Sequence, residues 1–172
     1  GERNVAIGKT ALEANLGGSF NIAAGYGALR LNTSGDSNTA IGYNAMLANQ
    51  TGEGNTAVGE GALDANNPGD NNVAIGKLSL SDNTTADNNT AVGTCALKAN
   101  TTGEDSVAVG GNSLDANTTG SYNNAVGRNS LTTNTTGTKN NALGHSSLEL
   151  NTTGDNNVAF GHKSLEANTT AC

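Results

Sequence analysis

Aromatic side chains are almost absent from this sequence: they make up 3% of the 172 residues, and tryptophan does not occur. Proline occurs once and cysteine twice. Hydrophobic residues reach only 34%, whereas roughly 45–50% apolar residues, glycine included, are usual in soluble domains. This composition excludes the large hydrophobic core of an ordinary globular domain, and taken alone it would indicate disorder.

Basic residues and long apolar runs are also scarce. The formal net charge is −7, so we expect no sequence-independent binding to nucleic acid. No apolar run approaches the roughly 20 residues that a membrane span needs, and we expect no membrane insertion of this segment. No signal peptide is visible at Gly1, so we expect export and anchoring signals, where they exist, to be encoded elsewhere.

The sequence does contain a strict internal repeat. Ten consecutive 17-residue units follow one another without insertion or deletion, with the consensus N-T-A-V-G-x-x-A-L-x-A-N-T-T-G-D-N. Because the period never slips, each unit must occupy the same place relative to its neighbours, and residues 1–172 form a single repeat domain. Positions 1 to 17 of each unit are counted from the following first residues: Asn4, Asn21, Asn38, Asn55, Asn72, Asn89, Ser106, Asn123, Asn140 and Asn157.

The period predicts an all-β fold, a parallel β-solenoid (β-roll) in which each unit is one coil. Positions 1 to 5 and roughly 7 to 11 are too short and too rich in Gly for helices, so we expect both to be strands. Positions 12 to 17 carry turn residues. Coils stacked about 4.8 Å apart would give a rod on the order of 48 Å long.

Three columns of the repeat never vary: Ala at position 3, Gly at position 5 and Asn at position 12. Gly at position 5 suits a sharp turn with positive φ or a close backbone approach. We expect each position-12 Asn to point inward, to donate its amide to the next coil and to accept from the previous one, because such a ladder satisfies buried polar groups. The predicted ladder residues are Asn15, Asn32, Asn49, Asn66, Asn83, Asn100, Asn117, Asn134, Asn151 and Asn168.

Neighbouring positions 3 and 4 are both apolar in every unit, although neighbouring side chains of a strand point to opposite faces. We assign Ala to the narrow interior and position 4, together with position 2, to the outside. The resulting apolar stripe, some 48 by 8 Å, would approach 400 Å², which implies a partner. The predicted oligomer interface comprises Val5, Ile7, Ile41, Val58, Ile75, Val92, Val109 and Val126.

The strand motifs N-V-A-I-G at Asn4–Gly8 and Asn72–Gly76, N-T-A-I-G at Asn38–Gly42, and N-T-A-V-G at Asn55–Gly59 and Asn89–Gly93 carry a family resemblance. They resemble the head repeats of trimeric autotransporter adhesins and the repeats of bacteriophage and viral tail fibres. The resemblance implies a homotrimer of left-handed β-rolls with the strand residues facing the trimer axis. It also implies an extracellular location, at a cell or virion surface, and a role as a rigid spacer or adhesive rod. The unit is longer than adhesin heads typically use, which favours the fibre.

Two threonine columns, at positions 13 and 14, leave an ice-binding solenoid as the alternative function. Adjacent columns point in different directions, which disfavours it. A mutant lacking Thr102, Thr119 and Thr136 together should lose any such activity.

Other candidate sites are weaker. Stacked carboxylates at position 16 could attract Ca²⁺, but the solenoid lacks the G-G-x-G-x-D calcium motif. His145 and His162 share position 6 and could stack within about 5 Å. Cys95 and Cys172 should lie around 20 Å apart along the rod, too far for a disulfide. No nucleophile–base set recurs, so we expect neither catalysis nor a cofactor. The calcium candidates are Asp36, Glu53, Asp70, Asp87, Glu104 and Asp155.

Overall fold

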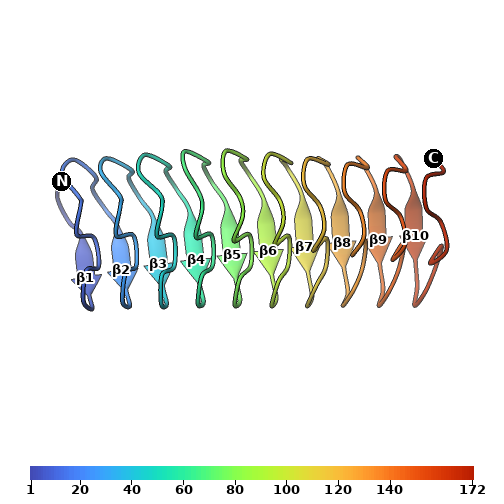
Figure 1. Cartoon of the computed structure of the whole chain (residues 1–172), viewed down its shortest axis with the longest axis horizontal. Coiled ribbons are helices and arrows are strands. Elements are labelled where there is room, and N and C mark those ends of the chain that lie inside the picture. The colour runs from blue at the N-terminus through green and yellow to red at the C-terminus, as the bar shows by residue number, and fades with distance from the viewer.

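The computed structural model describes all 172 residues as one rod of stacked coils (Figure 1). Its ten strands form a single parallel sheet in chain order, and each residue pairs with the equivalent residue of the next coil, as in Val73↔Thr90. No helix is present. This architecture confirms the predicted all-β parallel solenoid with a 17-residue coil. The strands are β1 Val5–Ile7, β2 Ile22–Ala24, β3 Thr39–Ile41, β4 Thr56–Val58, β5 Val73–Ile75, β6 Thr90–Val92, β7 Val107–Val109, β8 Asn124–Val126, β9 Asn141–Leu143 and β10 Val158–Phe160.

Each strand is only three residues long, at positions 2 to 4. The β-branched residues that dominate positions 2 and 4 favour extended backbone. The Gly at position 5 ends the strand, with φ between 121° and 142° in every coil. Only glycine adopts this conformation readily, which explains why this column never varies.

The second predicted strand, at positions 7 to 11, is wrong. Residues at positions 7 and 9 have left-handed backbone in every coil, for example Cys95 with φ of 57° and Leu97 with φ of 51°. Their N–H groups therefore alternate in direction: Cys95 N donates to Lys77 O in the previous coil, whereas Leu97 N donates to Ser113 O in the next. The segment joins neighbouring coils by hydrogen bonds without forming a second sheet.

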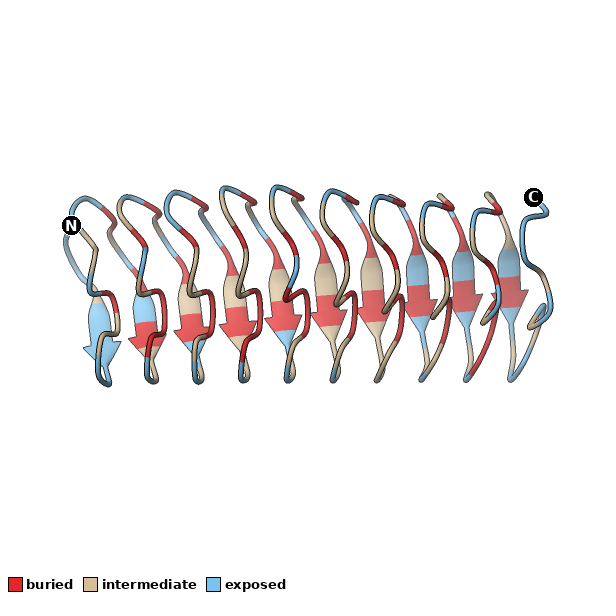
Figure 2. Ribbon diagram, viewed as in Figure 1, coloured by how far each residue is buried: buried red, intermediate tan, exposed pale blue.

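A narrow apolar core runs the length of the rod. It consists mainly of the position-3 Ala and the position-9 Leu or Met, with a small Ala or Ser at position 8 beside them. Ala91 and Leu97, for example, have 0% exposure. The interior of one coil has room for a single branched side chain, which explains why a sequence without tryptophan and with few aromatics can still fold. Figure 2 shows the buried centre of most strands between more exposed ends.

Two parallel ladders of Asn side chains join the coils beside this core. In the position-12 ladder, Asn100 Nδ2 donates to Asn83 Oδ1 in the previous coil (3.0 Å) and to Gly103 O in its own coil (2.9 Å). The direction is opposite to the predicted one, because each amide donates backward and accepts from the next coil.

The second ladder, at position 1, was not predicted. Asn89 Nδ2 donates to Gly103 O (2.8 Å), the same carbonyl that the position-12 ladder uses, and Asn89 N donates to Asn72 Oδ1 (3.0 Å). Nearly every unit begins with Asn, so the signal was present in the sequence. The two ladders together satisfy the buried polar groups at the turn between coils.

Candidate self-association surface

The side chains at positions 2 and 4 form one continuous outer surface of the sheet, here called the strand-face stripe. Position 3 between them is buried from β2 onward. Position 4 is half-buried in β2, β4, β6 and β7 and exposed in the other strands, from 37% at Val126 to 79% at Phe160. Neither column contains Lys, Arg, Asp or Glu. The stripe is therefore an uncharged and largely apolar surface along the whole rod.

The size of the stripe bears on what could cover it. Nine strand spacings of about 4.8 Å and a width of roughly 8 Å give about 350 Å². A stable pairwise interface usually buries about 800 Å² on each partner. The stripe alone falls short of this value, so a stable interface would also have to include side chains that flank the stripe.

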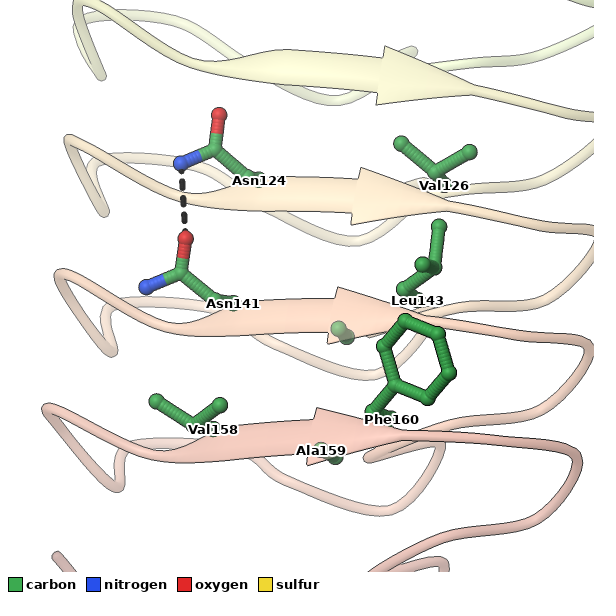
Figure 3. Close-up of a pocket in the computed structure, with 8 residues that line it drawn as sticks. Asn124, Val126, Asn141, Leu143, Val158, Ala159 and Phe160 are labelled. Carbon is green, nitrogen blue, oxygen red and sulfur yellow. Dashed lines mark hydrogen bonds between the residues drawn. The ribbon is translucent and has the colours of Figure 1, made fainter.

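Near the C-terminal end the stripe contains a hollow at position 4 and a pair of amide side chains at position 2 (Figure 3). Val126, Leu143 and Phe160 line an apolar hollow of about 230 Å³. At position 2 of the same coils, Asn124 Nδ2 donates to Asn141 Oδ1 (2.9 Å). This amide pair replaces the Val, Ile or Thr that position 2 carries in every other unit.

Of the six position-16 carboxylates, the calcium candidates, the four Asp residues each accept a hydrogen bond from a backbone N–H of the previous coil, whereas the longer Glu53 and Glu104 do not; the four are Asp36, Asp70, Asp87 and Asp155. Asp87 Oδ1 accepts from Asp70 N (2.7 Å), and Ser121 Oγ accepts from Glu104 N (3.0 Å) in the same way. No group of three or more His, Cys, Asp or Glu side chains converges anywhere in the chain. The position-16 column therefore has a structural explanation: a short acceptor side chain accepts a hydrogen bond from the position-16 backbone N–H of the preceding coil.

The two threonine columns have different environments. Thr101 is half-buried and its Oγ1 donates to Thr118 O in the next coil (3.0 Å), so the position-13 hydroxyl is used within the fold. At position 14, Thr102, Thr119 and Thr136 are exposed. Only one of the two columns therefore presents free hydroxyl groups to solvent.

The position-6 column carries exposed rings at both ends of the rod. Tyr26 and Tyr43 stack with centroids 5.4 Å apart, and His145 and His162 lie 5.1 Å apart with their planes tilted by 36°. Both cysteines are free thiols. Cys172, at position 16, accepts a hydrogen bond from the backbone N–H of the preceding coil through Sγ (3.4 Å).

Asp64, at position 10, is a polar residue that sequence reasoning missed. Its Oδ1 atom is buried without a hydrogen-bond partner. Burial raises the pKa of Asp64, the nearby carboxylate of Asp82 adds to the rise, and the backbone N–H of Leu47 acts against it. Because the folded pKa exceeds the unfolded value, this group favours folding most below the unfolded pKa. That contribution is lost as pH rises through the folded pKa.

Replacing Asp64 by Thr should therefore stabilise the protein at pH 7. At the same position, Thr132 Oγ1 donates to Asn112 O, so a threonine hydroxyl has a partner there. We expect a gain of about 1 kcal/mol, the low end for an unpaired buried acceptor because much of the side chain reaches water, or about 2–4 °C in melting temperature. Thermal unfolding at pH 7 and pH 3.5 measures it, and the gain should shrink at the lower pH. Glu13→Thr, at the exposed position 10 of the first coil, is the control; an Asp64→Thr variant that melts no higher than the parent at pH 7 would contradict the assignment.

The fold and the stripe define the class of the chain: a parallel β-solenoid repeat protein. Comparison with protein-family models, with curated proteins and with solved structures finds no match. None of its segments forms a helix that is long and apolar enough to span a membrane.

Proposed function

We propose that the chain is a rigid segment of a homotrimeric extracellular fibre on a cell or virion surface. It acts as a spacer and as an adhesive, receptor-binding rod rather than as an enzyme. The observation that carries the proposal is the uncharged strand-face stripe, which leaves residues such as Ile7 and Ile41 64% and 43% exposed along the rod. Surfaces of this kind mark sites of association.

Continuous stacking supports the mechanical part of the proposal. Every strand pairs with its neighbours in the same register, and both Asn ladders continue from coil to coil, with Ser106 replacing Asn once. Such a rod resists bending because no coil can move without breaking bonds to two others. The variable position-6 column, with its stacked Tyr26–Tyr43 pair, offers side chains outside the stripe for contacts with a surface ligand.

The first test is the mass of the chain in solution and its response to a charge in the stripe. The parent should sediment at about 51 kDa at micromolar concentration, three times the 17.1 kDa of one chain. Val92→Asp should reduce this to the monomer mass, because three carboxylates would be brought together without partners in an apolar contact. Analytical ultracentrifugation measures both.

Thr94→Asp is the matched control, because Thr94 belongs to the same coil and is exposed at position 6, outside the stripe. It should remain trimeric. Circular dichroism would show whether Val92→Asp retains the fold. A parent that sediments as a monomer, or a Val92→Asp variant that stays trimeric, would contradict the proposal.

Ice binding is supported by one observation, the exposed threonine column at position 14, which is Thr in seven of the ten coils. The position-13 hydroxyls are already bonded to backbone, so the column stands alone. A monomeric parent that shows thermal hysteresis in dilute solution would favour this second function over the fibre.

A further inference from the structure

The position-2 column of the strand-face stripe contains Val, Ile or Thr except at one place, where two carboxamide side chains, Asn124 and Asn141, stand in consecutive strands β8 and β9. Both side chains are exposed, and they lie beside the apolar side chains of Val126 and Leu143 (Figure 3). Apolar contact alone does not explain why two carboxamide side chains lie in this stripe.

The hydrogen bond between the two amides leaves a specific pair of groups free. Asn124 Nδ2 donates to Asn141 Oδ1, while Asn124 Oδ1 and Asn141 Nδ2 have no partner within the chain. The pair thus leaves one acceptor and one donor group free at the surface. A second copy of the same pair offers the same two groups, so the amides are self-complementary, as a repeated interface around a symmetry axis requires.

If a second chain covers the stripe, it buries the free Asn124 Oδ1 and Asn141 Nδ2 atoms. Their burial costs free energy unless each of them finds a new hydrogen-bond partner. A buried carboxamide without a partner loses its hydrogen bonds to water. When copies associate in register, each Asn pair meets another Asn pair. A slip by one coil, about 4.8 Å, leaves one amide of each pair opposite Val107 or Val158, which have no polar side-chain atoms.

We infer that Asn124 and Asn141 fix the axial register of self-associating chains, with a second copy of this chain as the occupant of the hollow beside them. A single polar position in an apolar coiled-coil seam has the same effect on register and chain number. The rest of the stripe supplies less of it, because position 4 is Val or Ile in seven of the ten coils and a slipped arrangement would bury much of the same apolar surface. This inference rests on the proposed self-association.

The test compares register in the parent and in an Asn124→Val/Asn141→Val variant. Val occupies position 2 in other coils, including Val107 and Val158, so the strands should fold normally. A spin label on Cys95 reports distances between chains once Cys172 is replaced by Ser, which keeps an acceptor at position 16 as Ser121 does.

Double electron–electron resonance should give one narrow distance distribution for the labelled parent. The Asn124→Val/Asn141→Val variant should give additional, longer distances from chains slipped by whole coils, and native mass spectrometry should show more than one oligomer size. Thr39→Val/Thr56→Val, which removes two polar groups from the same column elsewhere, should keep the parent distribution.

The possible failures are distinguishable. A monomeric parent would overturn the proposed function and this inference together. A parent trimer whose distances are unchanged in the Asn124→Val/Asn141→Val variant would overturn only the register role. Equal broadening in Thr39→Val/Thr56→Val would also overturn it, because general loss of polarity would then explain the effect.

Discussion

Replacing Gly93 by Ala should lower the stability of the rod more than most single substitutions. A Cβ atom at this position would lie 2.7 Å from both the carbonyl carbon and the oxygen of Gly110 in the next coil. The backbone also has φ of 137°, which side-chain-bearing residues rarely adopt. Neither coil can move away easily, since Gly93 N and Gly110 N are both hydrogen-bonded to preceding strands, at 2.7 and 2.8 Å.

We expect a loss on the order of 4 kcal/mol, which places this change among the exceptional single substitutions. The melting temperature should fall by roughly 8–16 °C, at about 2–4 °C per kcal/mol. Thermal unfolding followed by circular dichroism measures it. Because each coil is supported mainly by its neighbours, a break in the middle of the rod weakens the contact between two half-rods.

Gly161→Ala is the control, because it separates the clash from the backbone conformation. Gly161 has φ of 121°, but nothing lies within 4 Å of the added Cβ, since it belongs to the last coil. The stability that Gly161→Ala loses should be confined to the cost of placing alanine in this backbone conformation, about 1–2 kcal/mol. Equal losses in the two variants would show that close coil stacking is not what keeps this column Gly.

The strict period was sufficient to predict the solenoid, its parallel register and the inward Ala column. The conflict between adjacent apolar positions 3 and 4 correctly indicated that one of them lies outside, because alternation in a strand admits no other arrangement. These features follow from the side-chain pattern alone.

The second strand was mispredicted because the segment at positions 7 to 11 is too short for a helix, yet its residues at positions 7 and 9 adopt left-handed rather than extended backbone. Leucine at position 9 has φ near 50°, as in Leu97 and Leu148, a conformation that propensity disfavours by roughly 1–2 kcal/mol per residue. Burial of the leucine in the narrow core and the hydrogen bonds to both neighbouring coils offset this cost. Only the stacked structure reveals that balance.

The polar features were harder to predict than the apolar ones. The role of position 16 depends on a short acceptor reaching one backbone N–H, and an acidic residue such as Asp36 or Asp87 in a turn motif does not by itself indicate such a contact. The Asn124–Asn141 bond depends on two adjacent coils differing from the consensus together. A consensus emphasises what the units share, so it conceals positions where a few of them differ.

Replacing Asn100 by Leu should disrupt the position-12 ladder at its centre. Leu is close to Asn in shape but cannot form hydrogen bonds. The change removes the bonds to Asn83 Oδ1 and Gly103 O and the bond that Asn100 Oδ1 accepts from Asn117 Nδ2 (2.9 Å). The neighbouring ladder groups are buried and no water can replace the lost partner.

Each buried polar group left unpaired costs about 1–3 kcal/mol, and Asn83 and Asn117 each lose a partner, so we expect a total loss of roughly 3–5 kcal/mol. Urea titration and thermal unfolding measure the loss. Asn168→Leu is the matched control in the last coil. Asn168 donates to Asn151 Oδ1 and Ala171 O, both at 3.2 Å, but accepts from no following coil and is only half-buried. Its loss should stay near 1 kcal/mol, because water can reach the groups that it leaves. If the Asn100→Leu and Asn168→Leu variants lose the same stability, the ladder contributes only hydrogen bonds within each turn. The invariance of position 12 would then reflect the shape of the turn rather than a chain of hydrogen bonds between coils.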